Sequence, residues 1–401
     1  MTLMRLYQRF LLGTMLSVII LPLSGCWSNK EIEDLGLVAG TSLDLATNSD
    51  FSGSLEEQEG RPSNRELITI TNQLVTSETT ATGAKGGTVH QQAYKNVSET
   101  GDTVLPTLRN MLLKIDKRAF AEHSKVIIIA EDLASTLNLK QTLDFFLREL
   151  EIRPSGVLLI AKNRASDILE SNEQTKIPAF QLREMIQGHE RTSKILPPMT
   201  FAKLEGKLNS NASFLLQYVV SENGEVKFVG AAVIEGKTKT FRGSLNALEL
   251  EGISWITGKA KGGLVESFDE KTNQPIIYEA LSMKSKILPS VKGDSISFHV
   301  KIESEGRIAE HWVLTEKTFN NKFLKIAEQT TKKEVERLID NVLKKIQQQY
   351  QTDVSGFGNS LRIEYPKVWE KVKKNWDQIF SEVSITYEVK INIKDYGTSG
   401  D

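Results

Sequence analysis

Hydrophobic residues recur with two different periods in the last third of the chain. Between residues 383 and 393 they occupy every second position, which is the pattern of a strand with one buried face. Between residues 319 and 350 they are three or four positions apart and predict a long amphipathic helix, through Phe323, Ile326, Val335, Leu338, Ile339, Val342, Leu343 and Ile346. A second helix is expected over residues 359–380, restarted at Pro366. We therefore expect two helices to cover one face of an antiparallel sheet.

Two short, continuous apolar runs mark the first half of the chain. Residues 125–130 (KVIIIA) contain four consecutive β-branched residues and residues 156–161 (GVLLIA) are apolar, as in strands buried on both faces. A helical pattern over residues 139–149 lies between them. Strand, helix and strand in this order predict a parallel pair within a mixed sheet, with a right-handed crossover.

Turn residues suggest how the chain is divided. Asn223-Gly224 separates two apolar-rich runs and predicts a tight hairpin within a small α+β unit. Pro197-Pro198 interrupts the chain after a helical stretch. We predict an α+β protein with three mixed α/β domains, at residues 26–197, 198–287 and 288–401.

The first 25 residues have the anatomy of an export signal. Arg5 and Arg9 precede an apolar run, residues 10–23, that is short for a membrane span. The run ends in Leu23-Ser24-Gly25-Cys26, which resembles the lipobox of bacterial lipoproteins. We expect cleavage before Cys26, which would become an N-acyl diglyceride cysteine on the outer face of the cell membrane. The alternative is an uncleaved N-terminal anchor with an incidental cysteine.

Composition and charge exclude some classes of partner and of stabilising site. The chain has 50 basic and 51 acidic residues, so no overall field selects nucleic acid as a partner. Cys26 is the only cysteine, which excludes an intramolecular disulfide and a multi-cysteine metal site.

No familiar catalytic or cofactor motif was found in the sequence. The glycine-rich residues 81–88 lack the spacing of a phosphate-binding loop. The sequence also contains neither the G-x-S-x-G nucleophile elbow of hydrolases nor the H-E-x-x-H motif of zinc proteases. His123 stands alone before a buried strand and is interpreted as a packing or capping residue. Trp369 and Trp376 are seven residues apart and are expected in the core. We expect no enzyme activity, no metal and no cofactor.

Several segments together resemble the Ger(x)C family, the lipoprotein C subunits of bacterial spore nutrient germinant receptors. They are Gly25-Cys26-Trp27, residues 35–40 (LGLVAG), residues 122–129 (EHSKVIII), residues 144–148 (DFFLR), residues 151–154 (EIRP), residues 353–358 (DVSGFG), and Tyr365-Pro366 with Trp369, Trp376 and Phe380. The resemblance spans nearly the whole chain, although the loops at residues 44–64 and 81–87 match nothing in the family pattern.

The resemblance implies a non-enzymatic subunit, held at the spore inner membrane by Cys26, that acts with integral-membrane A and B subunits to trigger germination. Two other classes share the expected compartment. One is the extracytoplasmic solute-binding lipoprotein of a transporter, which generally has two similar α/β lobes. The other is a hydrolase, which needs a nucleophile and a base.

Overall fold

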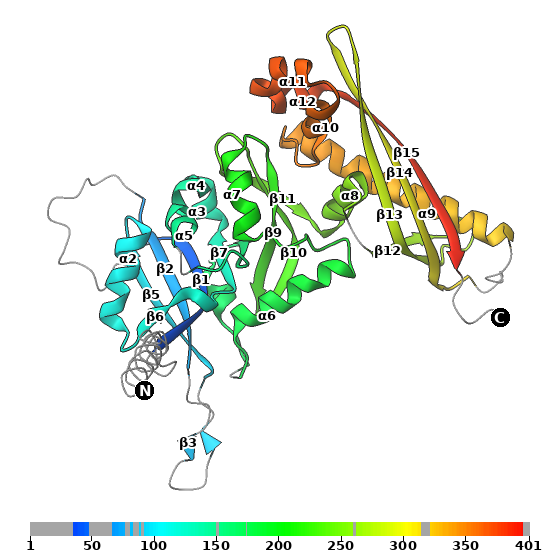
Figure 1. Ribbon diagram of the computed structural model, residues 1–401. Coiled ribbons are helices and arrows are strands. Elements are labelled where there is room, and N and C mark those ends of the chain that lie inside the picture. Colours follow the sequence, from blue (N-terminus) through cyan, green and yellow to red (C-terminus); the bar gives the residue numbers. More distant parts are fainter. Residues whose placement is uncertain are drawn as a thin grey trace, which may run out of the picture.

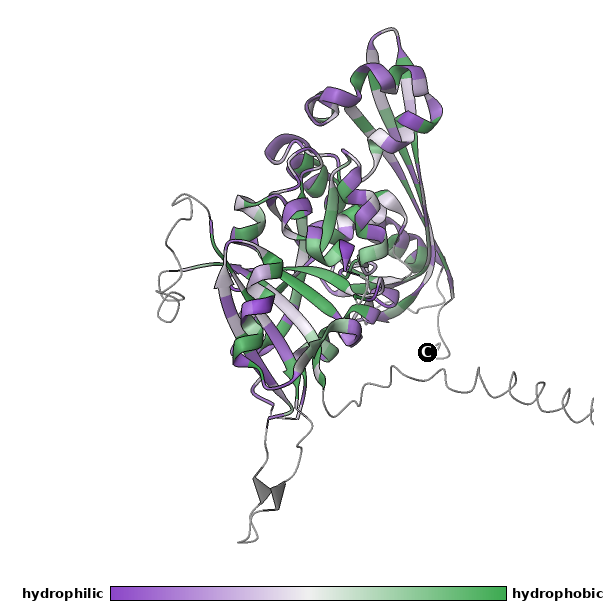
Figure 2. Ribbon diagram, turned by 60° about the vertical axis from the view of Figure 1, so that its left-hand side comes forward, coloured by the Kyte–Doolittle hydropathy of each residue, from purple (hydrophilic) through white to green (hydrophobic). Residues whose placement is uncertain are grey.

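The structure, a computed structural model, describes residues 35–47, 66–76, 81–82, 88–89, 92–149, 152–173, 175–259, 262–313 and 321–395. These residues form two bodies, each built around its own sheet (Figure 1). Figure 2 shows that hydrophobic residues follow the strands at the centre of the larger body. The α+β class predicted from the sequence is confirmed.

The first body holds a nine-stranded sheet in the order β11-β10-β9-β8-β7-β1-β2-β5, with β6 pairing with β1 off this path. Its strands are β1 (Leu35–Leu45), β2 (Ile68–Val75), β5 (Tyr94–Gly101), β6 (Arg118–Phe120), β7 (Val126–Ala130), β8 (Val157–Ala161), β9 (Phe214–Glu222), β10 (Glu225–Ile234) and β11 (Phe241–Asn246). A separate short pair joins β3 (Ala81–Thr82) to β4 (Thr88–Val89).

The centre of this sheet is the predicted parallel pair. All five residues of β7 and all five of β8 are buried, and Ile127 pairs with Leu158 in parallel register. Aliphatic side chains on both faces suit a strand that is covered on both sides. The helices of this body are α2 (Val104–Met111), α3 (Glu131–Thr136), α4 (Leu139–Thr142), α5 (Asp144–Arg148), α6 (Pro178–Met185) and α7 (Phe201–Asn209).

The second body holds a four-stranded sheet in the order β12-β13-β14-β15. Its strands are β12 (Gly263–Phe268), β13 (Pro275–Lys292), β14 (Ser295–His311) and β15 (Ser384–Asp395), and its helices are α8 (Ala247–Thr257), α9 (Asn321–Lys344), α10 (Phe357–Glu364), α11 (Pro366–Val372) and α12 (Trp376–Glu382). Val389, Ile391 and Ile393 are buried, so the predicted one-sided strand is confirmed. The predicted antiparallel sheet is wrong at this edge, because β15 pairs parallel with β14. Helix α9 carries the chain back along the sheet, so β14, α9 and β15 form a β-α-β crossover.

Strand β10 and helix α8 join the two bodies. Ala232 and Ile234 belong to the hydrophobic core of the first body, whereas Ala231 and Val233 belong to that of the second. Successive side chains of a strand point to opposite faces, so β10 supplies both cores. Helix α8 packs between this sheet and α9, and a Cβ on Gly252 would lie 2.5 Å from the carbonyl oxygen of Leu338.

The sheets do not follow the predicted domain limits. The hairpin at Asn223-Gly224 is confirmed, but its strands extend the large sheet instead of building a separate small unit. The limit at residues 287/288 falls inside β13, a strand that the sequence reading missed. The three-domain division at 26–197, 198–287 and 288–401 stays a prediction.

The predicted single helix over residues 359–380 is wrong. The chain forms three short helices, α10, α11 and α12, with Pro366 in the first turn of α11 as expected. Proline lacks the amide donor that a continuous helix needs, so it begins a helix here.

Candidate functional site

The predicted lipid-attachment residue Cys26 and the lipobox residues Leu23, Ser24 and Gly25 lie outside the described residues. Their roles stay predictions. Within the described ranges, no group of three or more His, Cys, Asp or Glu side chains is placed to hold a metal ion. The same part of the chain contains no helix with the length and hydrophobicity required to span a bilayer.

The motif at residues 353–358 is organised by the buried carboxylate of Asp353. Both carboxylate oxygens accept hydrogen bonds at the start of α10, where the first amides of a helix have no partner within the helix. Oδ1 accepts from the amides of Ser355 (3.2 Å), Gly356 (2.8 Å) and Phe357 (3.2 Å), and Oδ2 accepts from the amide of Gly358 (2.7 Å) and from Nε1 of Trp376 (2.9 Å). One side chain therefore fixes the helix start and ties it to α12.

The tryptophans of the motif pack around Gly358. A Cβ on this residue would lie 2.5 Å from Nε1 of Trp376 and 3.0 Å from the ring of Trp369. The two indoles meet edge to face at a centroid distance of 5.5 Å. Trp376 is buried in the core of the second body, as predicted. Trp369 is only partly buried, and it stands on a different helix from Trp376.

A cleft of about 890 Å³ opens beside this motif, between the two bodies; we call it the interbody cleft. One wall comes from α7 and from the turn after β10, and the opposite wall comes from α10 and the segment that joins α11 to α12. Its lining is rich in basic residues, which are Lys203, Lys207, Lys237, Lys259, Arg362, Lys373 and Lys374. The two acidic residues in the lining are Asp353 and Asp377. This arrangement can attract and hold an anion.

Burial shifts the pKa of two groups in the interbody cleft. It raises the pKa of Asp377, and the neighbouring Asp353 carboxylate adds to this effect. It lowers the pKa of Lys207, and the positive charge of Lys259 lowers this pKa further. The site thus contains a half-buried ammonium group next to a second one, an unfavourable arrangement that a bound anion would relieve.

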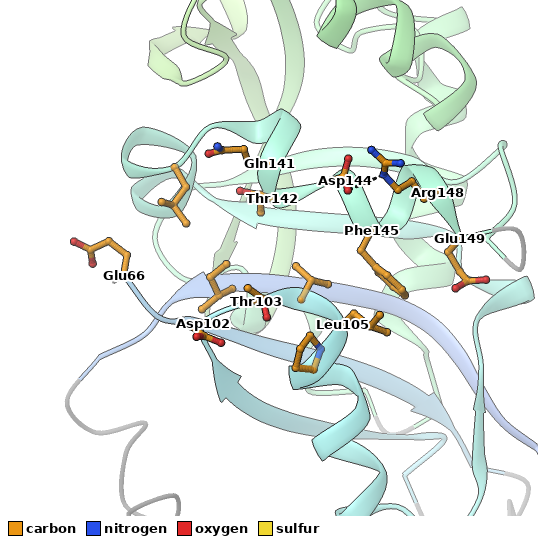
Figure 3. A pocket seen from close by; sticks show the side chains of 14 residues that line it. Glu66, Asp102, Thr103, Leu105, Gln141, Thr142, Asp144, Phe145, Arg148 and Glu149 are labelled. Atoms are coloured by element: carbon orange, nitrogen blue, oxygen red, sulfur yellow. Dashed lines mark hydrogen bonds and ion pairs between the residues drawn. The ribbon is translucent and has the colours of Figure 1, made fainter. Parts of the chain in front are cut away.

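A second cleft, of about 910 Å³, lies within the first body (Figure 3). Apolar side chains such as Phe145 and Leu105 line it, and Arg148 pairs with Asp144 at 2.8 Å on its rim. Asp144, Phe145 and Arg148 belong to the DFFLR segment of the family pattern. The remaining polar groups of the lining are Glu66, Asp102, Thr103, Gln141, Thr142 and Glu149.

One histidine contacts a hydroxyl group, but it does so on the open face of the second sheet. Nδ1 of His299 lies 2.9 Å from Oγ1 of Thr386, and its Nε2 lies 3.9 Å from Oε1 of Glu388. These residues line none of the clefts described above. An exposed sheet surface has no enclosed site in which a nucleophile is activated, so this contact gives no support to hydrolysis.

Sequence reasoning did not find the basic lining of the interbody cleft. Its lysines lie between positions 203 and 374 and come from both bodies, so no local pattern connects them. The motif at residues 353–358 was noticed as a family segment, but its role at the start of α10 was not. A glycine-rich turn after an aspartate was the available signal, since Asp is a common helix-capping residue.

Comparisons with known proteins cover nearly the whole chain. Residues 28–221 match the family model described as "Spore germination protein N-terminal domain", and residues 229–397 match "Spore germination B3/ GerAC like, C-terminal". The chain is 44% identical to spore germination protein YndF of Bacillus subtilis (strain 168) over 385 residues, which are 95% of each protein. It is 29% identical to spore germination protein B3 of the same organism, over 95% of this chain and 96% of that protein.

A solved structure has a similar fold. The structure described as "Crystal Structure of the GerBC protein" superposes with a TM-score of 0.60 at 25% sequence identity. The match covers 82% of this chain and 94% of that one.

Proposed function

The chain belongs to the Ger(x)C family of spore germination proteins, and from this we propose that it is the lipid-anchored, non-enzymatic C subunit of a nutrient germinant receptor. The observation that carries the proposal is similarity to spore germination proteins along 95% of the chain. The partners we propose are integral-membrane A and B subunits, and the location is the outer face of the spore inner membrane.

The fold favours a receptor subunit over a solute-binding lipoprotein. A solute-binding protein generally has two similar lobes, whereas the two sheets here differ in strand number and order. We also propose that the subunit is not an enzyme, because the described residues contain no metal cluster and the contact between His299 and Thr386 lies on an open surface.

The lipid anchor on Cys26 limits how the protein is oriented. Strand β1 begins at Leu35, nine residues after Cys26, and a chain of this length extends at most ~30 Å. The end of the first body that contains the start of β1 therefore faces the bilayer. Leu113 lies near this end, five residues before Arg118, which pairs with Leu35. Its side chain is 88% exposed, which suits contact with the membrane surface.

Replacing Cys26 with Ala tests the anchor and the role together. Two acyl chains hold a protein on a membrane lastingly, so we expect the full-length variant to leave the membrane fraction and the nutrient response to fall with it. Retention at the membrane would refute the lipid as the main attachment. A normal response from released protein, in spores without a related receptor, would refute the tethered-subunit role.

A further inference from the structure

The lining of the interbody cleft is far more basic than the chain as a whole. Seven of its 21 residues are Lys or Arg, against 50 of 401 in the full sequence. The chain is nearly neutral overall, so this concentration of positive charge is local. A cleft lined by one sign of charge concentrates the opposite ion, because its low-dielectric walls focus the field.

The carboxylates of the cleft do not neutralise this charge. Asp353 already accepts five hydrogen bonds from the start of α10 and from Trp376. Asp377 accepts the amide hydrogen of Asp353 at 3.2 Å. Even if both are counted as full negative charges, seven cations face two anions.

Most of the basic side chains have no carboxylate partner. Lys373 is paired with Glu370 at 2.6 Å, and Lys203 bonds to the carbonyl oxygen of Pro198 at 3.4 Å. Across the described ranges, no salt bridge is formed by Lys207, Lys237, Lys259, Arg362 or Lys374. Arg362 donates a hydrogen bond to Oδ1 of Asn359 at 2.9 Å, but none of the five has a carboxylate partner that a bound anion would have to displace.

Lys207 is influenced by the charge of Lys259, which is itself exposed. Lys207 is half-buried on α7, and Lys259 follows the end of α8. Two ammonium groups in a partly desolvated site repel each other, and an oxyanion between them removes both the repulsion and part of the desolvation cost. Across the cleft, the planar guanidinium of Arg362 can bind two oxygens of one phosphate or carboxylate group.

We infer that the interbody cleft binds a small dissolved polyanion that carries phosphate or carboxylate groups. Lys207 contacts it from the first body, and Lys259 and Arg362 contact it from the second, so the ligand bridges the two bodies. Figure 1 shows α7 near the middle of the molecule and α10 above it in the second body, both away from β6, where the start of β1 lies. With the lipid attached before β1, the walls of the cleft lie away from the end of the molecule that faces the bilayer, which favours a dissolved anion over a lipid headgroup.

Inorganic pyrophosphate is a suitable probe for this site. It would be titrated against the full lipidated protein in neutral phosphatidylcholine vesicles, at constant ionic strength, by calorimetry and by tryptophan fluorescence. Trp369 lines the cleft and reports on its occupancy. We expect saturable binding that chloride at the same ionic strength does not reproduce, and at least tenfold weaker binding when Lys207→Gln and Lys259→Gln are combined.

Two further variants distinguish binding at the interbody cleft from a general effect of the protein's charge on anion binding. Lys286→Gln removes an exposed charge from β13 and should leave binding unchanged. Lys207→Arg keeps the charge and should keep most of the affinity. Equal pyrophosphate affinity in the wild type and the double variant would overturn the inference. So would binding to phosphatidylglycerol vesicles through the same lysines without any binding of pyrophosphate, because the ligand would then be a lipid headgroup.

Discussion

The indole of Trp376 donates a hydrogen bond from Nε1 to Oδ2 of Asp353 at 2.9 Å, across 23 residues of sequence. Both groups are buried, and the same carboxylate accepts four backbone amides. The contact joins α10 to α12 and forms one edge of the interbody cleft. Stability of the second body and the shape of the cleft therefore depend on the same side chain.

Substituting Asp353 by Asn tests this dependence. The Asn amide nitrogen cannot accept a hydrogen bond, so the buried donors that bond to one of the two carboxylate oxygens lose their acceptor. We expect a loss of ~2–4 kcal/mol in the free energy of unfolding, measured by denaturant titration. Asp116→Asn on the surface is the matched control and should change stability by less than ~0.5 kcal/mol. An unchanged midpoint for Asp353→Asn would contradict the proposed network.

Two glycine substitutions should have opposite effects on stability. Gly358→Ala places a Cβ 2.5 Å from Nε1 of Trp376, and we expect a loss of ~1–3 kcal/mol together with altered tryptophan fluorescence. Gly206 lies in helix α7, and a Cβ there meets nothing within 4 Å. Gly206→Ala should stabilise the protein by up to ~1 kcal/mol, because alanine favours helix. The idea fails if the two variants melt alike.

The buried carboxyl group of Glu251 should make stability depend on pH. Burial raises its pKa to about 7, and Lys194, at 3.9 Å, offsets only part of this effect. The folded protein holds the proton more tightly than the unfolded chain does. The contribution of Glu251 to stability is therefore highest below about pH 4.5 and falls as the pH rises towards 7, by on the order of 3 kcal/mol.

The Glu251→Gln variant isolates this contribution. Its denaturation midpoint should fall less than that of the wild type between pH 5 and pH 7. The stability of both proteins should still depend on pH through Asp44, since burial raises the pKa of Asp44 to about 6. Identical pH profiles for the two proteins would show that Glu251 titrates normally.

The orientation on the membrane can be measured with a fluorescent label. Cys26 is the only natural cysteine, so Leu113→Cys gives a unique site once Cys26 carries lipid. We expect brominated lipids to quench a dye at position 113. A dye at Leu281→Cys is the control, because Leu281 is 55% exposed on β13 in the second body. A dye at position 113 that is no better quenched than the control would refute the orientation, while membrane retention of both would leave the anchor intact.

Regular periodicity made the secondary structure predictable. The strands β7 and β8, the hairpin at Asn223-Gly224 and the helix α9 follow from patterns that act locally. Strand β13 was missed because shifts in its pairing, between Ile277 and Tyr278 and between Ala280 and Ser282, interrupt the alternation of apolar positions. The parallel pairing of β15 depends on the path of α9, which the sequence of β15 does not encode.

Polar contacts between distant segments, including those of the candidate site, were much less predictable than the fold. Asp44 was assigned to a loop, but it is buried in β1 and accepts hydrogen bonds from the amides of Ala165 (2.5 Å) and Ser166 (3.0 Å). The hydrogen-bond partners of Asp44 are more than a hundred residues away, so the local sequence around Asp44 does not indicate them. The basic lining of the interbody cleft was missed for the same reason, because its residues come from segments that are far apart in the sequence.

The sharing of β10 between two hydrophobic cores limits how this protein can be divided into fragments. The two family models meet between residues 221 and 229, which is within the β9-β10 hairpin. A fragment that ends there would keep β9 with an open backbone edge and would expose the apolar surface that β10 covers. Neither half is then expected to remain soluble by itself, and heating the intact chain should give a single calorimetric transition.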